Sequence, residues 1–353
     1  MVQAGGVVVV TGASGYIGSH ACVALASKGY RVRGVVRDKD APDNQFLAAA
    51  CKAAGAMHPL ELFSADVASP GALDAAVAGA AAVVHTAQVV KFGLPDPVDQ
   101  MIKPAVAGVE NVLAACEKEA GVEAFIHISS IAAVMHAKEE PKGGVYDEQC
   151  HNGFATPDLD PYSTSKVLGE EAVWAHATAK RLQTFRTVVI APGACIGPVL
   201  HKRHGGSSPQ VIQQLMAGKF PVAPDMGLAL TAVADVAAAC VAAVERPAAR
   251  GRYLICGGTS FPFVEVARML TSAAPGYKYP TTKAPRWLML AVAAFDKRIS
   301  AKMLRLRWSR HWPSFCNTRA QSDLEVDCDA HDWPALLGET ARSLVEVGLV
   351  GEQ

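Results

Sequence analysis

The first half of the chain alternates short apolar runs with longer stretches of helical spacing. The apolar runs lie at Val7–Val10, Arg31–Val36, Leu60–Phe63, Ala82–His85 and Phe125–Ile128. Runs such as VVVV and AVVH carry no polar alternation, which is typical of strands that helices cover on both faces. Helical spacing lies between them at Ile17–Lys28, Pro70–Ala78 and Val98–Glu119. The alternation predicts βαβ units and therefore a parallel sheet.

The regular alternation ends after the apolar run Thr187–Ala191, where proline and glycine become frequent. Beyond it, helical stretches near Pro209–Ala217 and Asp235–Glu245 and a strand-like run at Tyr253–Cys256 are mixed with loops. We therefore expect an α/β fold, with a Rossmann-type, doubly wound parallel sheet in residues 1–194. Residues 195–353 are expected to form mainly a smaller, mixed C-terminal lobe that binds substrate and is interleaved with the last strands of the sheet.

A glycine-rich turn connects the first predicted strand to the first predicted helix. Gly12 permits a tight turn, Gly15 lets the backbone approach a pyrophosphate, and Gly18 allows the helix to pack closely on the strand. The helix N-terminus presents free N–H groups and a partial positive charge to the phosphates. The residues predicted to bind the dinucleotide at this turn are Gly12, Ser14, Gly15, Tyr16, Ile17 and Gly18.

The end of the second predicted strand indicates which dinucleotide binds. An acidic residue there binds the ribose 2′-hydroxyl of NAD, whereas an arginine accommodates the 2′-phosphate of NADP. The strand is followed by Arg37, Asp38 and Lys39, so its tip is basic. We predict NADP(H), with Arg37 on the phosphate and Lys39 as a second contact. Asp38 is the alternative, because a shift of one residue would bring it to the ribose.

Tyr162 and Lys166 share one face of a helical stretch that starts at Pro161. At this spacing the two Cβ atoms lie ~5–6 Å apart. A phenol has a pKa near ~10, and an adjacent ammonium is expected to lower that pKa. The pair is therefore a candidate acid–base centre that also binds the cofactor.

Two serines follow the strand Phe125–Ile128, at the edge of the sheet where ligands of open α/β sheets bind. A carbonyl that accepts a hydride needs a hydrogen-bond donor for its developing negative charge. Successive residues leaving a strand point to opposite sides, so only one of Ser129 and Ser130 can face the site.

Composition and charge narrow the function classes. Lys plus Arg and Asp plus Glu number 33 each, so no net field would recruit nucleic acid. The 9 cysteines form no C-x-x-C pair and indicate reduced thiols of a cytoplasmic protein. The first apolar run has no basic region before it, which favours a strand over a signal peptide. No apolar run reaches the ~18 residues of a membrane-spanning helix, and the closest is Trp287–Phe295.

We assign no separate functional site to the remaining histidines or to the basic stretch near the C-terminal part of the chain. His201 and His204 form an H-x-x-H pair without a carboxylate or cysteine, so we predict no metal site and a substrate-side or solvent loop. His85 and His127 lie at strand ends and are expected to be hydrogen-bonded parts of the scaffold. Residues 297–310 are basic and amphipathic, for which a solvated helix face is favoured over membrane contact or an anionic substrate.

The glycine-rich turn, the strand-end serine pair and the Tyr-x-x-x-Lys spacing, in this order, resemble the extended short-chain dehydrogenases/reductases. The likeness runs nearly end to end and is closest to the branch of dihydroflavonol reductases, cinnamoyl-CoA reductases and microbial aldehyde reductases. Besides Tyr162 and Lys166, it implies Ser130 as the catalytic serine and Arg37 as the 2′-phosphate ligand. The other cofactor contacts that it implies are Asp66 and Val67 beside the adenine, Thr86 and Ala87 along the cofactor path, and Pro192 near the nicotinamide.

The resemblance implies an NADPH-dependent reductase that converts a small aldehyde or ketone, including a dihydroflavonol-like carbonyl, to an alcohol. The Asn-Trp-Tyr-Cys-Tyr motif of cinnamoyl-CoA reductases is absent, and Asp160-Pro161-Tyr162-Ser163 stands in its place, which disfavours a CoA thioester. The enzyme alternatives are a 3β-hydroxysteroid dehydrogenase/isomerase and a nucleotide-sugar epimerase or dehydratase. The alternative outside enzymes is an NADP-sensing regulator. We expect a monomer or homodimer whose partner is its small-molecule substrate.

Overall fold

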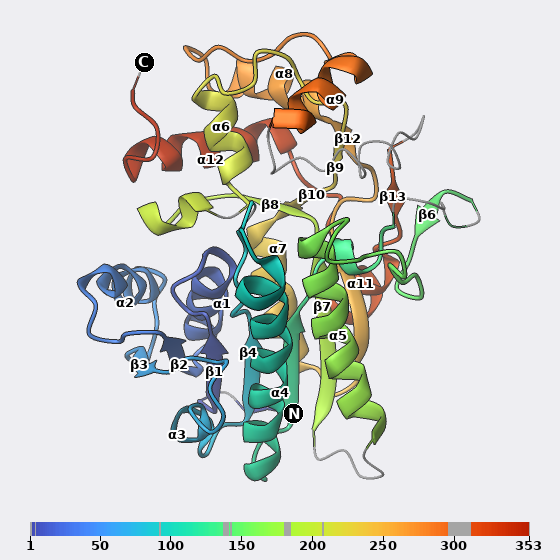
Figure 1. Ribbon diagram of the computed structural model, residues 1–353. Helices are drawn as coiled ribbons and strands as arrows, with labels where there is room; N and C mark the ends of the chain where they lie inside the picture. The colour runs from blue at the N-terminus through green and yellow to red at the C-terminus, as the bar shows by residue number, and fades with distance from the viewer. Residues whose placement is uncertain are drawn as a thin grey trace.

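The computed structural model describes residues 2–3, 5–91, 93–136, 141, 143–179, 185–206, 208–295 and 312–352 (Figure 1). Its centre is a sheet of seven described strands in the order β11-β7-β5-β4-β1-β2-β3. The strands are β1 (Val7–Thr11), β2 (Arg31–Val36), β3 (Glu61–Ser64), β4 (Ala82–His85), β5 (Ala124–Ile128), β7 (Arg186–Pro192) and β11 (Gly251–Ile255). The Rossmann-type sheet predicted from the sequence is confirmed.

Every neighbouring pair in this sheet is parallel. The register aligns Thr11 with His85, and His85 with His127. The carboxyl ends of β1, β4 and β5 therefore lie side by side at one edge, which we call the carboxyl edge. From β1 the chain first adds β2 and β3 on one side, and it then adds β4, β5, β7 and β11 on the other side. At the carboxyl edge, this reversal leaves the crevice in which open α/β sheets bind ligands.

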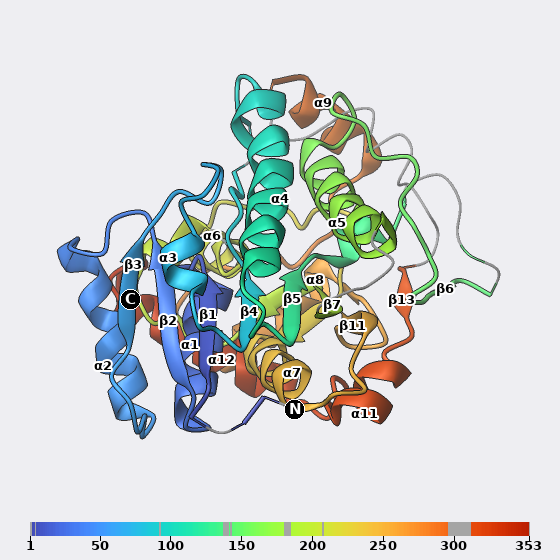
Figure 2. The same cartoon turned by 90° about the horizontal axis from the view of Figure 1, so that it is seen from below.

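Helices cover both faces of the sheet (Figure 2). Their bounds are α1 (Tyr16–Ser27), α2 (Gln45–Ala53), α3 (Asp74–Val77), α4 (Lys103–Lys118), α5 (Pro161–Ala179) and α7 (Val233–Glu245). Helices α4 and α5 pack together on one face, and α1 and α7 pack together on the other (Figure 2). Val8 and Val10 belong to one buried cluster and Val9 to the other, because successive strand residues point to opposite faces. This is why the first strand is apolar at each position.

The remaining elements lie mainly above and beside the carboxyl edge (Figure 1). They are β6 (Val145–Tyr146), β8 (Ala194–Ile196), the short helix η4 (Lys202–Gly206), α6 (Gln210–Met216), β9 (Gly227–Leu228), β10 (Leu230–Ala232), β12 (Phe261–Pro262), α8 (Phe263–Ala273), α9 (Arg286–Phe295), β13 (Ser314–Phe315), α11 (Thr318–Leu324) and α12 (Trp333–Glu346). Leu270 of α8 and Leu344 of α12 share a buried cluster with Val8 and Ile190 of the sheet. The two parts of the chain are thus joined by one core. The boundary at residue 194 stays a prediction.

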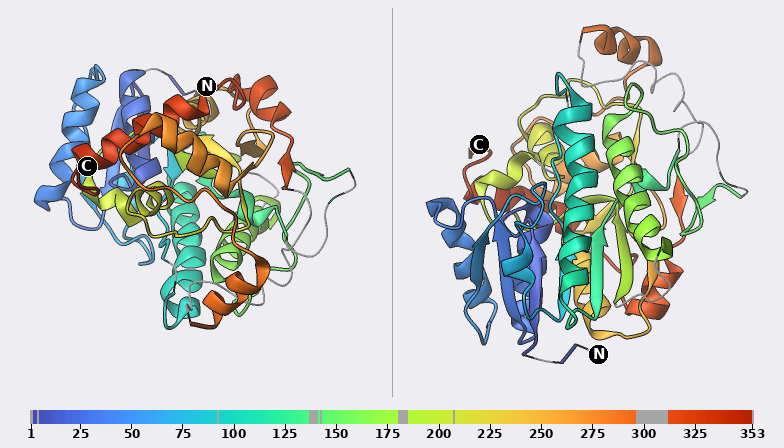
Figure 3. Two further views of the ribbon diagram at one scale, coloured as in Figure 1. Left: turned by 90° about the horizontal axis from the view of Figure 1, so that it is seen from above. Right: turned by 60° about the horizontal axis from the view of Figure 1, so that its bottom comes forward.

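Helix α9 is the darker orange helix that stands out at the top of the right-hand view in Figure 3. Its Trp287 is 70% exposed. Among the described residues, no helix is both long and apolar enough to cross a membrane. The basic stretch 297–310 lies outside the described residues.

Two predicted helices differ in extent from the structure. Of Pro70–Ala78, only Asp74–Val77 is α-helical, because Gly71 has a φ of 75° and turns the chain before the helix begins. Val98–Glu119 is divided into a π-helical turn at Val98–Ile102 and α4. Pro104 follows this junction and has no N–H with which to continue the α-helical ladder.

We expect Gly18→Ala to destabilise the fold. A Cβ on Gly18 would lie 2.2 Å from the carbonyl oxygen of Gly12, which is backbone and cannot rotate away. Such overpacking costs ~1–3 kcal/mol, measurable as a lower urea midpoint. The control is Gly169→Ala in α5, where the nearest atom is Val109 Cγ2 at 3.9 Å. It should keep or raise stability, since alanine is the better helix former. Equal stability of the two variants would contradict the expectation.

Candidate active site

The glycine-rich turn lies tightly against the end of β4. Gly12 has a φ of 66°, and a Cβ there would lie 2.8 Å from the Cα of Ala87. The hydroxyl of Thr86 donates to the carbonyl of Thr11 at 2.7 Å, and the hydroxyl of Thr11 meets His85 Nδ1 at 2.8 Å. The predicted positions Gly12, Thr86 and Ala87 are therefore brought together at the carboxyl edge.

Helix α1 directs its N-terminus toward the same edge. Gly15 is exposed and precedes the helix, and the first helical hydrogen bond runs from Ser19 N–H to the carbonyl of Gly15 at 2.9 Å. The N–H groups of residues 16–18 come before this ladder and have no helical acceptor. The side chain of Tyr16 is buried, and its hydroxyl donates to Gly197 O at 3.0 Å. Tyr16 can therefore contact a ligand at the carboxyl edge only through its backbone.

The tip of β2 presents an exposed arginine. Arg37 forms no hydrogen bond or ion pair with another described residue. The carboxylate of Asp38 accepts the N–H of Asp40 at 3.0 Å, and Lys39 Nζ lies 3.2 Å from Asp40 Oδ1. Asp38 is engaged within its own turn, whereas the guanidinium of Arg37 is available to an anion.

The predicted adenine contacts follow β3, next to β2. The carboxylate of Asp66 accepts the N–H of Ala68 at 3.0 Å, and Val67 O accepts from Asn111 Nδ2 at 3.0 Å. These bonds fix the loop between β3 and α3 and hold it against α4. Asp66 and Val67 therefore lie toward one end of the carboxyl edge, and the predicted catalytic residues toward the other.

Helix α5 supplies Tyr162 and Lys166. The carboxylate of Asp160 caps this helix by accepting the N–H of Ser163 at 3.1 Å, and Pro161 occupies the first turn. The side chain of Ser130 lies next to the phenol of Tyr162, where it acts to lower the pKa of that phenol. Lys166 Nζ is buried and donates to the carbonyl of Ile128 at 3.2 Å. The three residues predicted to be catalytic are thus in one place.

Burial controls the pKa values of this group. It raises the pKa of Tyr162 to about 12, against a smaller lowering by the neighbouring side chain of Ser130. The expected lowering of the Tyr162 pKa by Lys166 is therefore wrong for this structure. The pKa of Lys166 falls to about 8, because burial disfavours the ammonium form. At neutral pH the phenol keeps its proton and the amine keeps its charge.

The two serines at the end of β5 point to different partners. Ser129 Oγ donates to Glu170 Oε2 at 2.6 Å. Ser130 Oγ accepts the N–H of Ala132 at 3.1 Å and lies 3.4 Å from Pro192 O, to which it donates. Because its side chain also lies next to Tyr162, Ser130 is the serine that faces the candidate site, and Pro192 closes the same side.

The paired histidines lie beneath Lys166 on β4 and β5. His85 stacks on His127 with ring centroids 5.5 Å apart, and both are buried. Burial lowers the pKa of His85 to about 3 and that of His127 well below its usual value. Nδ1 of His127 has no hydrogen-bond partner among the described residues. Neutral rings of this kind suit a scaffold, although only His85 has the expected hydrogen bond.

The position of η4 excludes the solvent loop that was one of the two alternatives for His201 and His204. His204 is buried, with Nε2 at 3.2 Å from the carbonyl of Ser14 in the glycine-rich turn, so it is not in a solvent loop. Phe46 stacks on His201 at 4.7 Å between centroids. Arg203 donates to Asn44 Oδ1 at 2.8 Å. No metal-binding cluster occurs in the described part of the chain.

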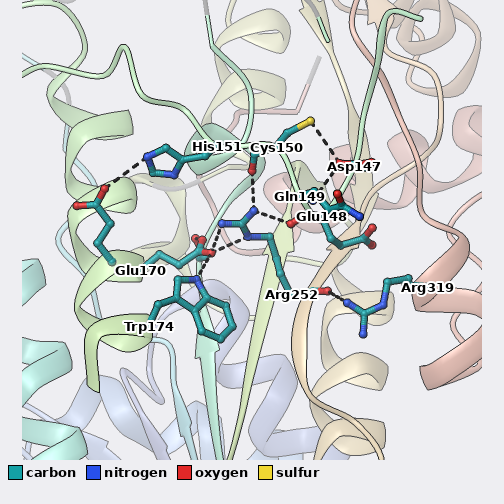
Figure 4. A network of polar contacts seen from close by, with 11 residues as sticks. Asp147, Glu148, Gln149, Cys150, His151, Glu170, Trp174, Arg252 and Arg319 are labelled. Atoms are coloured by element: carbon teal, nitrogen blue, oxygen red, sulfur yellow. Dashed lines mark hydrogen bonds and ion pairs between the residues drawn. The ribbon is translucent and has the colours of Figure 1, made fainter. Parts of the chain in front are cut away.

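Glu170 and Arg252 were not identified as site residues from the sequence, yet they form a buried ion pair (Figure 4). The carboxylate of Glu170 also accepts the hydroxyl of Ser129. One local signal could have revealed Glu170. It follows Lys166 by four residues, as Lys166 follows Tyr162, so all three share a helix face. Nothing local indicates Arg252 as its partner.

Fold and site together define a dinucleotide-binding oxidoreductase. The profile of the NAD dependent epimerase/dehydratase family matches residues 8–256. Anthocyanidin reductase ((2S)-flavan-3-ol-forming) of Vitis vinifera is 32% identical over 285 residues, covering 77% of this chain and 82% of that protein. Cinnamoyl-CoA reductase 1 of Petunia hybrida is 35% identical over 279 residues, covering 78% and 80%. The chain belongs to the NAD dependent epimerase/dehydratase family, within the extended short-chain dehydrogenases/reductases.

Solved structures share the fold. The yeast methylglyoxal/isovaleraldehyde reductase complexed with NADPH gives a TM-score of 0.77 at 23% identity, over 96% of this chain and 98% of that chain. UDP-glucose 4-epimerase from Bifidobacterium longum, in complex with NAD⁺ and UDP, gives 0.72 at 18% identity, over 96% and 98%. Because reductase and epimerase give similar scores, the scaffold does not separate the two reactions.

Proposed function

We propose that the protein is an NADPH-dependent reductase that converts a small aldehyde or ketone to an alcohol. The observation that carries the proposal is that the side chain of Ser130 and the phenol of Tyr162 lie next to each other at the carboxyl edge, with the buried ammonium of Lys166 on the same helix face as Tyr162. A bound nicotinamide supplies the hydride. Ser130 orients the carbonyl, and Tyr162 donates the proton to its oxygen.

The protonation states support reduction. A phenol with a pKa of about 12 is protonated at neutral pH, so Tyr162 holds the proton that a reduction consumes. An alkoxide is a much stronger base than a phenolate, so transfer from Tyr162 to the product oxygen is favourable. Lys166 holds the ribose of the cofactor and stabilises the phenolate that is left behind.

The residues at the other end of the edge fit an NADP-type dinucleotide. Gly12 leaves no room for a Cβ beside Ala87, and the first N–H groups of α1 face the edge. Both features suit a pyrophosphate. The exposed Arg37 suits a 2′-phosphate, while the carboxylate of Asp38 is engaged with Asp40.

The relatives' names favour reduction over the alternatives. The curated relatives described above are reductases by name, and both are at least 32% identical to this chain. An epimerase or dehydratase of this fold would retain NAD, which Arg37 disfavours. The 3β-hydroxysteroid dehydrogenase/isomerase alternative has no described feature in its favour. The NADP-sensing regulator is disfavoured because Tyr162 and Lys166 are both present and in place. An NADPH-oxidation screen over aldehydes, ketones, dihydroflavonols and steroids tests the proposal.

Arg37→Ala should weaken NADPH selectively. Loss of a charge-assisted phosphate contact costs ~1.5–3 kcal/mol, whereas NADH has no 2′-phosphate to lose. The measurement is kcat/KM with each cofactor. A wild-type preference for NADH of about tenfold or more would overturn the cofactor assignment.

Tyr162→Phe should lower kcat by ~10²–10⁴-fold, because it removes the proton donor and keeps the ring. The dissociation constant of NADPH, measured by fluorescence, should change little. A variant that retained more than about a tenth of the wild-type rate would show that another group is the acid.

The reduction rate should fall as the pH rises through about 8, where Lys166 loses its proton. A lysine is charged below its pKa, so the rate is highest on the acidic side of this value. Tyr162 stays protonated throughout, since its pKa is about 12. The control is Lys166→Arg, whose guanidinium stays charged, so its residual rate should not fall over this range. A wild-type profile that is flat up to pH ~10 would be inconsistent with a required ammonium.

A further inference from the structure

Glu170 is a buried carboxylate on the face of α5 that carries Lys166. Its Oε1 accepts from Arg252 Nε at 2.6 Å and from Trp174 Nε1 at 2.9 Å, and it lies 2.5 Å from Arg252 Nη2 in an ion pair. Its Oε2 accepts the hydroxyl of Ser129 at 2.6 Å. Figure 4 shows the guanidinium of Arg252 between this carboxylate and the chain that leads to α5. The carboxylate therefore joins α5 to both β11 and the end of β5.

Arg252 extends the network to a third element. Its Nη1 donates to the carbonyl of Glu148 at 2.9 Å and to that of Cys150 at 2.7 Å. These carbonyls belong to the segment between β6 and α5. One planar guanidinium thus sets the relative positions of a strand, a helix and a loop, which the single nitrogen of a lysine could not do.

The placement of this ion pair is more informative than its contribution to stability. The side chains of Arg252 and Glu170 are 10% and 2% exposed. Burying two charges has a large desolvation cost, so apolar residues of similar volume would often give equal or greater stability. A fixed geometry at the neighbouring site accounts for the pair better than stability does.

The ion pair fixes the position of the two serines at the end of β5. The N–H of Ser129 donates to Ile190 O at 2.8 Å within the sheet, while its hydroxyl is held by Glu170. With Ser129 held at both points, the next residue has little freedom to shift. Ser130 leaves the strand on the other side and meets Tyr162.

We propose that Glu170 and Arg252 are positioning residues that set the placement of Ser130 relative to Tyr162 for the reaction. This inference rests on the proposed function of the site. Neither residue contacts the reacting atoms. Both act through Ser129 and α5, so their effect requires the hydroxyl of Ser130.

A double-mutant cycle between Glu170 and Ser130 tests the proposal. Ser130→Ala should lower kcat by ~10²–10³-fold. Glu170→Gln should lower kcat by about tenfold while NADPH affinity changes less than about twofold, because only the alignment for proton transfer is disturbed. In the Ser130→Ala background, Glu170→Gln should change kcat less than about twofold, since an absent hydroxyl cannot be misplaced. Ser129→Ala removes one contact of Glu170 and should have a smaller effect than Glu170→Gln.

Two further variants separate positioning from folding. Glu170→Gln leaves the guanidinium of Arg252 without its counter-charge, so Glu170→Gln/Arg252→Met, which removes both charges, is measured beside it. The double variant should show the same loss of kcat with NADPH binding retained. The matched control is Glu117→Gln, which alters a carboxylate 2.5 Å from His176 Nε2, near the other end of α5. It should leave kcat unchanged.

The outcomes are distinct. If the Ser130→Ala/Glu170→Gln double variant loses the product of the two single-variant losses in kcat, the two residues act independently and the positioning role is overturned. An undiminished kcat in Glu170→Gln overturns it as well. The proposed function stands in both cases. A wild-type kcat in Ser130→Ala overturns the role of Ser130 and with it the positioning role, while reduction itself stands. Failure of the wild-type protein to oxidise NADPH with any carbonyl substrate overturns the proposed function. An equal loss in Glu117→Gln shows that any loosening of α5 has the same effect, and it also overturns the positioning role.

Discussion

The pairing of β1 with β4 is the contact on which the site depends. It brings Thr11 beside His85, and the turn that follows β1 lies against the residues that follow β4. The chain winds away from this pair in both directions, which opens the carboxyl edge for a dinucleotide. A turn that packs this tightly tolerates no side chain at Gly12 or Gly18. The predicted cofactor-binding residues and the predicted catalytic residues are therefore held in place by the same backbone.

Features that a short stretch of sequence determines were predicted well. Continuous apolar runs gave the strands, and the spacing of glycines gave the turn. The four-residue spacing of Tyr162 and Lys166 placed both on one face of α5. In each case the information lies within a few residues, so periodicity and local steric limits are sufficient to infer it.

Features that depend on the folded chain were missed. His204 meets Ser14, a partner 190 residues away, and Arg252 meets Glu170 across 82 residues. No local pattern encodes such pairs. The pKa of Tyr162 shows a related limit, because a neighbouring charge can be read from sequence whereas the degree of burial cannot. In the structure, burial is the largest cause of the raised pKa of Tyr162.

The cysteines are all free thiols, and most are buried. Cys195 lies near Lys166, whose charge favours the thiolate, yet burial raises the pKa of Cys195 to about 12. Burial also raises the pKa of Cys116 and Cys240 to about 12. Only thiolates are strong nucleophiles, so these side chains are inert at neutral pH. Under the proposed function the substrates are electrophilic carbonyl compounds, and thiols that stay protonated at these positions would not be modified covalently by them.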